Sequence, residues 1–136
     1  MGAPIQSIVG NSPVNPALLR LNVATFNLNA AAGSYTLFTA SGGDVWVEIE
    51  QAFVKVAAAG LTSALIETNH GAAAKSIVAS ALLAAITVDL VMTLVTTKFV
   101  LPSGKIIRGT IAGTGSGGSI LLVVKWAPLA TGALLV

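Results

Sequence analysis

The sequence predicts an all-β domain, a sandwich or barrel built from about seven or eight short strands. Apolar and polar residues alternate with a period of two, most clearly from Val45 to Ile49 and from Ser119 to Trp126. Clusters of Gly, Pro, Ser and Asn separate such segments and predict turns. The segments are rich in Val, Ile and Thr, whose branched side chains favour strands.

The first twenty residues differ from the rest of the chain. They contain Pro4, Pro13 and Pro16, and proline interrupts both helices and central strands. We therefore expect residues 1–20 to form an extended N-terminal arm and residues 21–136 to form the β-sandwich domain. The arm either frays into solvent or lies across a neighbouring subunit.

The strand pattern begins at Leu21 and is strongest between Val45 and Val56. In its first half, valine and isoleucine alternate with Trp46 and two glutamates, which fits a sheet with one dry face and one polar face. Residues 51–55 break the alternation and predict a bulge or bend. Further strands are expected at 35–39 and 61–69, with turns at 29–34, 41–44 and 57–60.

The middle of the chain is ambiguous. Alanines between Gly71 and Ala85 favour helix, so a short helix near 72–85 stands beside a strand as an alternative, before strand composition returns at 86–100. Ser76 to Val100 is also long enough to cross a membrane as a helix. Asp89 in its centre and the lack of a flanking basic cluster argue against a membrane span.

The last third alternates turns with strands. Turns are expected at 102–104 and 113–118, each as the loop of a hairpin, and strands at 105–112 and 119–126. In the final strand Leu121 and Val123 face away from the apolar set that ends at Trp126. A strand that is apolar on both faces is buried on both faces. Because a small sandwich covers only one of them, the second face needs a partner.

Composition supports that need for a partner. The 136 residues are 54% hydrophobic and only 9% charged, against about 25% charged in an average domain. So hydrophobic a chain is not disordered, and the absence of cysteine excludes disulfide scaffolds and thiolate metal sites. The net charge is +2, but no two basic residues are adjacent, so we expect no nucleic-acid partner.

The chain offers few candidates for chemistry. Gly113, Gly115 and Gly118 fit the dinucleotide-binding string G-x-G-x-x-G, but the next segment has strand rather than helix character, which favours a hairpin loop. His70 is the single histidine, and we expect it to be an ordinary loop residue.

Glu48 and Glu50 stand two apart beside Trp46, at a spacing that a glycosidase could use. Because both project from one face of one strand, we expect a solvated face or ion pairs with Lys55 or Arg108 instead. We predict no catalytic residue, no cofactor and no bound metal, and hence no enzyme.

Residues 101–136 resemble the ends of small structural proteins of tailed bacteriophage virions. The similar features are Leu101-Pro102-Ser103-Gly104, the Gly-rich loop, and Trp126-Ala127-Pro128-Leu129 before a hydrophobic tail, with Gly43-Asp44-Val45 upstream. The resemblance implies a jelly-roll-like antiparallel β-sandwich that assembles as trimers or rings on a head, tail or fibre. It implies no catalytic residues.

We therefore expect a non-enzymatic virion structural protein, a capsid decoration or cement protein that forms a homo-oligomer, with a trimer favoured. Its other partners would be virion proteins such as the major capsid protein, without nucleic acid or membrane. Assembly would take place in the host cytoplasm, since no secretory signal is visible. The expected oligomer interface comprises Leu121, Val123, Trp126, Leu129, Leu134 and Leu135, together with residues of 86–96. The expected arm contacts are Ile5, Ile8, Val9 and Leu18.

Two alternatives remain open from the sequence. A tail or fibre module that binds a receptor or glycan would use exposed aromatic and polar residues, with Tyr35, Trp46 and Asn69 as candidates and Trp126 as a further stacking residue. A small membrane protein would use the apolar stretch 76–100.

Overall fold

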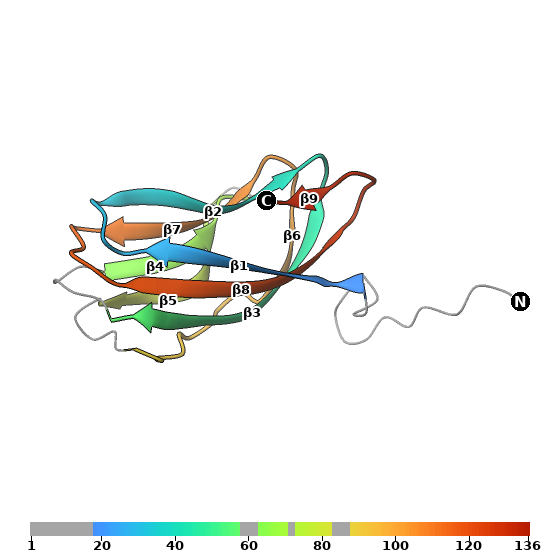
Figure 1. The fold of residues 1–136 in the computed structure, drawn as a ribbon. Helices are drawn as coiled ribbons and strands as arrows, with labels where there is room; N and C mark the ends of the chain where they lie inside the picture. The colour runs from blue at the N-terminus through green and yellow to red at the C-terminus, as the bar shows by residue number, and fades with distance from the viewer. Residues whose placement is uncertain (1–17, 58–62, 71–72, 83–87) are drawn as a thin grey trace, which may run out of the picture.

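The computed structural model describes residues 18–57, 63–70, 73–82 and 88–136, in which nine strands form two antiparallel sheets (Figure 1). The first sheet, here sheet A, has the order β1 (Arg20–Asn27), β8 (Ser119–Pro128), β3 (Val45–Val56) and β6 (Lys98–Leu101). Sheet B has the order β5 (Lys75–Leu82), β4 (Ser63–Thr68), β7 (Ile106–Ala112), β2 (Gly33–Ser41) and β9 (Leu134–Leu135).

The strand pairing is that of a jelly roll. Strand β1 pairs with β8, β2 with β7, β3 with β6 and β4 with β5, as in one long antiparallel hairpin rolled into two sheets. The additional pairs β3–β8 and β4–β7 join these hairpin layers into sheets A and B. The predicted jelly-roll-like antiparallel sandwich is therefore confirmed. Of the expected N-terminal arm, residues 1–17 lie outside the described part of the chain.

The sequence had suggested that the two glycine-containing turns of the last third close hairpins. In the structure they do not. The first joins β6 of sheet A to β7 of sheet B, and the second joins β7 back to β8 of sheet A. Turn residues mark where the chain reverses, but pairing depends on which strand edges and faces meet. In the second turn, Gly115 packs so closely that an added Cβ would lie 1.8 Å from the carbonyl oxygen of Leu28.

The alanine-containing segment near residue 80 forms a strand rather than the helix considered from its composition. Strand β5 pairs antiparallel with β4, with two register shifts, and buries Ile77 and Val78. In a helix, alanine is favoured over most other residue types by less than about 1 kcal/mol per residue. Pairing with β4 and burial of two branched side chains outweigh it. Residues 71–72 and 83–87 of the ambiguous segment lie outside the described chain.

The core lies between the inner faces of the two sheets. Its largest fully buried side chains are Phe26, Leu28, Ile66, Ile77, Leu101, Ile107, Ile111, Ile120 and Leu122. The two sheets pack closely where Phe26 of β1 lies over Gly109 of β7, because a Cβ on Gly109 would come within 2.5 Å of the phenyl ring. Glycine at this position is therefore a packing requirement.

The predicted bulge in the long strand β3 is confirmed. Its register against β8 shifts between Ile49 and Gln51. The shift keeps Ala52 and Val54 on the inner face with Val45 and the other apolar residues of the first half, all of which are buried. Without the extra residue the second half of β3 would turn its apolar side chains outward.

Residues 88–97 run along the open side of the sandwich instead of forming part of one long strand from 86 to 100. Val91 forms a bridge with Phe53 of sheet A, and Leu94 forms a bridge with Val78 of sheet B. The amide of Met92 donates to Ala52 (2.7 Å). This segment therefore covers the edges of both β3 and β5. Within the described residues, no helix has the length and apolar character that a membrane crossing requires.

Candidate functional site

The outer face of sheet A carries a continuous group of apolar side chains. We call this group the outer patch, and it consists of Leu21, Val23, Phe53, Val91, Leu121 and Val123. The strand register explains the continuity. Val23 lies opposite Val123, Leu121 lies opposite Phe53, and Phe53 in turn bridges to Val91. Directly paired residues share a face of the sheet, so these side chains follow one another from β1 across β8 and β3 to the segment 88–97.

The outer patch is exposed most at its two ends. Leu21 is 61% exposed and Val23 54% on β1, and Val91 is 59% exposed at the opposite end. Leu121 and Val123, in the middle, are half-buried between the neighbouring strands. Single exposed apolar residues are ordinary on protein surfaces, whereas a contiguous apolar patch marks an interaction surface.

A row of charged residues limits the outer patch on one side. Glu48 lies opposite Lys98 on one neighbouring strand and Lys125 on the other, and Lys125 Nζ pairs with Glu50 at 3.3 Å. Glu48 also accepts a hydrogen bond from the indole of Trp46 (3.0 Å). The expectation of ion-paired glutamates therefore holds for Glu50, but the predicted partners Lys55 and Arg108 were wrong.

The reason for the wrong partners is topological. Arg108 lies on β7 in sheet B, where it contacts Glu67 of the adjacent strand instead. The sequence alone does not show that β7 and β3 belong to different sheets. Lys55 lies on β3 itself, beyond the bulge.

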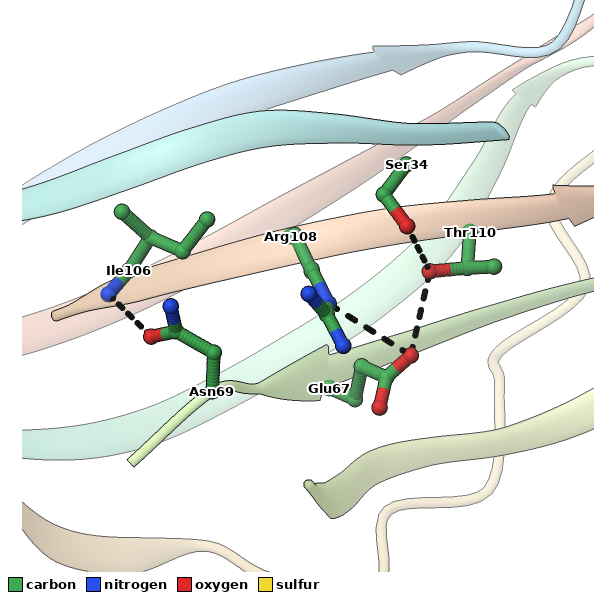
Figure 2. A network of polar contacts seen from close by, with 6 residues as sticks. All are labelled: Ser34, Glu67, Asn69, Ile106, Arg108 and Thr110. Carbon is green, nitrogen blue, oxygen red and sulfur yellow. Dashed lines mark hydrogen bonds and ion pairs between the residues drawn. The ribbon is translucent and has the colours of Figure 1, made fainter. Parts of the chain in front are cut away.

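The outer face of sheet B has the opposite character. Figure 2 shows a polar network that crosses three neighbouring strands, β2, β7 and β4. Ser34 and Thr110 share a hydrogen bond of 3.1 Å, and Thr110 donates to Glu67 Oε1, also at 3.1 Å. The Nε atom of Arg108 lies 3.6 Å from the same carboxylate oxygen, an ion-pair contact. Arg108 Nε is buried and has no hydrogen-bond partner among the described residues, so this ion-pair contact is its polar interaction with Glu67.

The structure divides the predicted oligomer interface among different parts of the molecule. Leu121 and Val123 lie in the outer patch, as the alternation of β8 predicts. Trp126 and Leu135 are buried in the core and offer no surface to a neighbour. Trp126 follows the inward-facing alternation of its strand, and Leu135 pairs with Ala40 of β2. Whether the remaining residues form an interface stays a prediction.

The other predicted contact residues lie away from the outer patch or outside the described chain. Leu129 and Leu134, in the C-terminal segment after β8, are exposed. Leu18, just before β1, is also exposed. The arm contacts Ile5, Ile8 and Val9 lie outside the described residues.

Sequence reasoning missed three members of the outer patch, Leu21, Val23 and Phe53, whereas Val91 falls within the range 86–96 that had been expected at the interface. A signal existed for the first two, because they alternate with Asn22 and Ala24. For Phe53 the signal was hidden by the bulge at Gln51, which reverses the alternation.

The three candidate glycan-binding residues do not come together. Trp46 is buried on sheet A. On sheet B, Tyr35 lies opposite Gly109 of β7 and donates its hydroxyl to Ala31 (2.7 Å). Asn69 instead accepts a hydrogen bond from the amide of Ile106, the first residue of β7 (2.7 Å; Figure 2). These side chains therefore form no common stacking surface.

His70 follows β4 in a loop, as predicted, but it is buried. Its Nδ1 lies 2.7 Å from Thr68 Oγ1, and its ring stacks on Phe99 of the other sheet at 5.5 Å between centroids. Burial, followed by the positive charges of Lys75 and Lys105, lowers the pKa of His70 below its ordinary value of 6.5. The neutral ring thus joins the two sheets. In the described part of the chain, no three His, Cys, Asp or Glu residues lie close enough to hold a metal ion.

Comparison with known proteins adds little to this geometry. No family model and no curated protein matches the chain. Among solved structures, the chain is similar to one in the "Structure of infectious bursal disease virus Gt strain", with 16% sequence identity and a TM-score of 0.29. The match covers 99% of this chain and 45% of that chain, so the sequence spans less than half the length of the structure that it matches.

Proposed function

We propose that the chain is a non-enzymatic structural protein of a virion that assembles with copies of itself through sheet A. The observation that carries the proposal is the outer patch, a continuous apolar surface on the outer face of sheet A, whereas a polar network crosses three strands of sheet B. Burial of apolar surface contributes about 25 cal/mol per Å² before the costs of association. Leu21, Val23 and Val91, each more than half exposed, supply that surface.

Charge supports the same proposal. The outer patch contains no charged residue, and a charged neighbour, Lys125, lies at its margin opposite Leu21. The adjoining row of Glu48, Lys98 and Lys125 contains both signs and fits the polar rim that surrounds many interface cores. An obligate interface of 2,000 Å² or more, of the kind roughly typical of permanent complexes, would not need further ionic contacts.

We propose a structural role in a virion for two reasons. The jelly-roll pairing of the strands is an architecture found in viral capsid domains, as well as in lectins and cupins. Residues 101–136, which include β7 and β8, resemble the ends of small structural proteins of tailed bacteriophages. We propose the specific role of a capsid decoration or cement protein, with the major capsid protein as the second partner.

Light scattering during size-exclusion chromatography tests self-assembly. We expect the full chain to elute as an oligomer at micromolar concentration, and Leu121→Lys to elute with a smaller mass because a charge enters the outer patch. Leu65→Lys is the matched control, since Leu65 is also a half-buried leucine but lies on the outer face of sheet B. A native chain with the mass of one subunit, or equal effects of the two substitutions, would overturn the proposal.

The virion role needs a separate test. Virus particles from cells that produce the protein would be banded on a density gradient and analysed by mass spectrometry. We expect a fixed number of copies per major capsid protein in the particle band. Recovery of the protein only in fractions without particles would reject the virion role and leave self-assembly intact.

A further inference from the structure

Strand β1 forms an edge of sheet A. It pairs with β8 over all eight of its residues, from Arg20 opposite Trp126 to Asn27 opposite Ser119, without a register shift. Among the described residues, no strand pairs with its other side. The edge of β1 is therefore a regular row of backbone groups without a protein partner in this part of the chain.

The hydrogen bond next to β1 identifies those backbone groups. The amide of Leu28 donates to Gly118 (2.9 Å), so these two residues form a hydrogen-bonded pair in the same register as β1 and β8. Such pairs alternate with non-hydrogen-bonded pairs along an antiparallel ladder. It follows that Leu21, Val23 and Thr25 direct their N–H and C=O groups away from β8, toward the free edge. Two of these three residues also belong to the outer patch.

The other edges of the two sheets are short, covered or irregular. Within the described chain β9 pairs with β2 only at Ala40 and Ser41, which leaves residues 33–38 of β2 at an edge, but this part of β2 contains a register shift between Thr36 and Phe38. Strand β6 has four residues and β9 has two. The edge of β5 receives residues 88–97, through the Val95 amide bonded to Ile77 (2.8 Å) and the Thr93 carbonyl bonded to Ala79 (3.3 Å). Lysine, proline and bulges commonly protect edge strands from pairing with other chains. From Leu21 to Asn27, β1 has none of these protections.

We propose that β1 pairs antiparallel with β1 of a second copy of this chain about a two-fold axis, with Val23 opposite Val23 of the partner subunit. The inference rests on the proposed self-assembly and names the edge through which it occurs. Leu21 then lies opposite Thr25 of the partner subunit, and the reverse pair follows from symmetry. Three hydrogen-bonded pairs, with two bonds each, would supply about six backbone hydrogen bonds.

Charge and continuity favour a second copy as the occupant. Arg20 is the single charged residue of β1. In the proposed register it faces Phe26 of the partner subunit, so the two arginines stand six residues apart along the strands, about 20 Å. Because paired residues share a face, the outer patches of both copies merge into one apolar surface across the enlarged sheet. That surface remains available for contact with a further pair or with the capsid.

This contact closes after two copies. Each chain has one β1 edge, and the two-fold axis uses both edges of the pair. At this surface we therefore replace the trimer expected from the sequence with a two-fold pair, from which larger assemblies are built.

The chain contains no cysteine, so single-cysteine variants report directly on the proposed contact. Hydrogen-bonded partners in an antiparallel ladder have Cα atoms about 5.5 Å apart, within the range of about 4.4–6.8 Å that disulfides span. Under mild oxidation we expect Val23→Cys to form a disulfide-linked dimer in most of the protein. Thr36→Cys, exposed on sheet B, is the control and should stay uncrosslinked.

The outcomes separate this inference from the proposed function. If the native chain is oligomeric but Val23→Cys forms no more dimer than Thr36→Cys, edge pairing is wrong and self-assembly stands. If Val91→Cys crosslinks and Val23→Cys does not, the patches stack face to face without pairing of the β1 edges, and edge pairing is also wrong. The Val23→Cys crosslink should survive in the Leu121→Lys background, because Leu121 lies on β8 and contributes no backbone group to the new edge contact.

Discussion

The two outer faces of the sandwich are built from strands with the same alternation, yet their chemistry is opposite. On sheet B, Ser34, Glu67, Arg108 and Thr110 form a hydrogen-bonded and ion-paired network across three strands. On sheet A, the corresponding positions hold the outer patch. Sheet A also carries charged residues, Glu48, Glu50, Lys98 and Lys125, but they are grouped beside the outer patch. The difference between the faces therefore lies in how apolar and polar side chains are placed, which composition does not report and which gives the assembly a direction.

The largest expected effect is that of Gly109→Ala. It would destabilise the whole sandwich, and with it both outer faces, because the two sheets share one core. The new Cβ would overlap the ring of Phe26, and overpacking of this kind costs about 1–3 kcal/mol or more. Urea unfolding followed by circular dichroism should show a lower midpoint. Adding Phe26→Leu should recover part of the loss, and an unchanged midpoint for Gly109→Ala would refute the close sheet contact.

An exchange of side chains between the faces should affect assembly but not folding. Val23→Thr keeps the shape of an exposed residue and adds a hydroxyl group to the outer patch, at a cost of about 1 kcal/mol per copy, or about fivefold in affinity. The reciprocal Thr36→Val, on exposed β2, should leave assembly unchanged. Sedimentation velocity over a dilution series measures both, and weaker assembly from Thr36→Val alone would reverse the assignment of the faces.

The ion pairs on the two faces should differ in strength. Glu67 and Arg108 are mostly shielded, with side chains 14% and 29% exposed, whereas Glu50 and Lys125 are 51% and 42% exposed. We expect Glu67→Gln to lower the free energy of unfolding by about 0.5–1 kcal/mol, and Glu50→Gln to change it by much less. Chemical denaturation of both variants at low and high salt checks the difference. Equal losses would mean that burial does not set the strength of these pairs.

The smallest effect concerns His70, which links the two sheets. Its lowered pKa means that the unfolded chain binds the proton more tightly than the folded one. Stability from the neutral ring is therefore complete above pH 6.5 and is lost as pH falls from there through the lower pKa of the folded state. Unfolding at pH 7.5 and at about pH 5 should show this loss in the native chain. His70→Gln should show a smaller loss, and an equal slope in both would contradict the assignment.

Much of the fold follows from the sequence, because alternation and turn residues are local signals. The double-sided apolar character of β8, the bulge after Ile49 and the turn at 102–104 were all readable in this way. The sequence did not show which strands pair with one another. The same turn chemistry serves a hairpin and a crossover between sheets, and only the closed jelly roll assigns β7 and β8 to different layers.

The candidate site was predicted only in part, at Leu121 and Val123 and in the range 86–96 that contains Val91. Leu121 and Val123 were identified from one strand, but the outer patch is a property of the sheet and needs the register of β1 and β3. Trp126 was expected at an interface, although its alternation already placed it with Ile120, Leu122 and Val124 on one face of its strand. Burial of a side chain depends on the face it occupies more than on its type.

Carbene footprinting of the full chain at micromolar concentration tests the central claim most directly. Leu21 and Val23 are exposed in the single chain, as is Thr36 on the opposite sheet. The account predicts strong labelling near Thr36 and weak labelling at Leu21 and Val23, with the latter rising on dilution as copies separate. Labelling of all three in proportion to their exposure, at every concentration, would show that sheet A remains uncovered and would contradict the account.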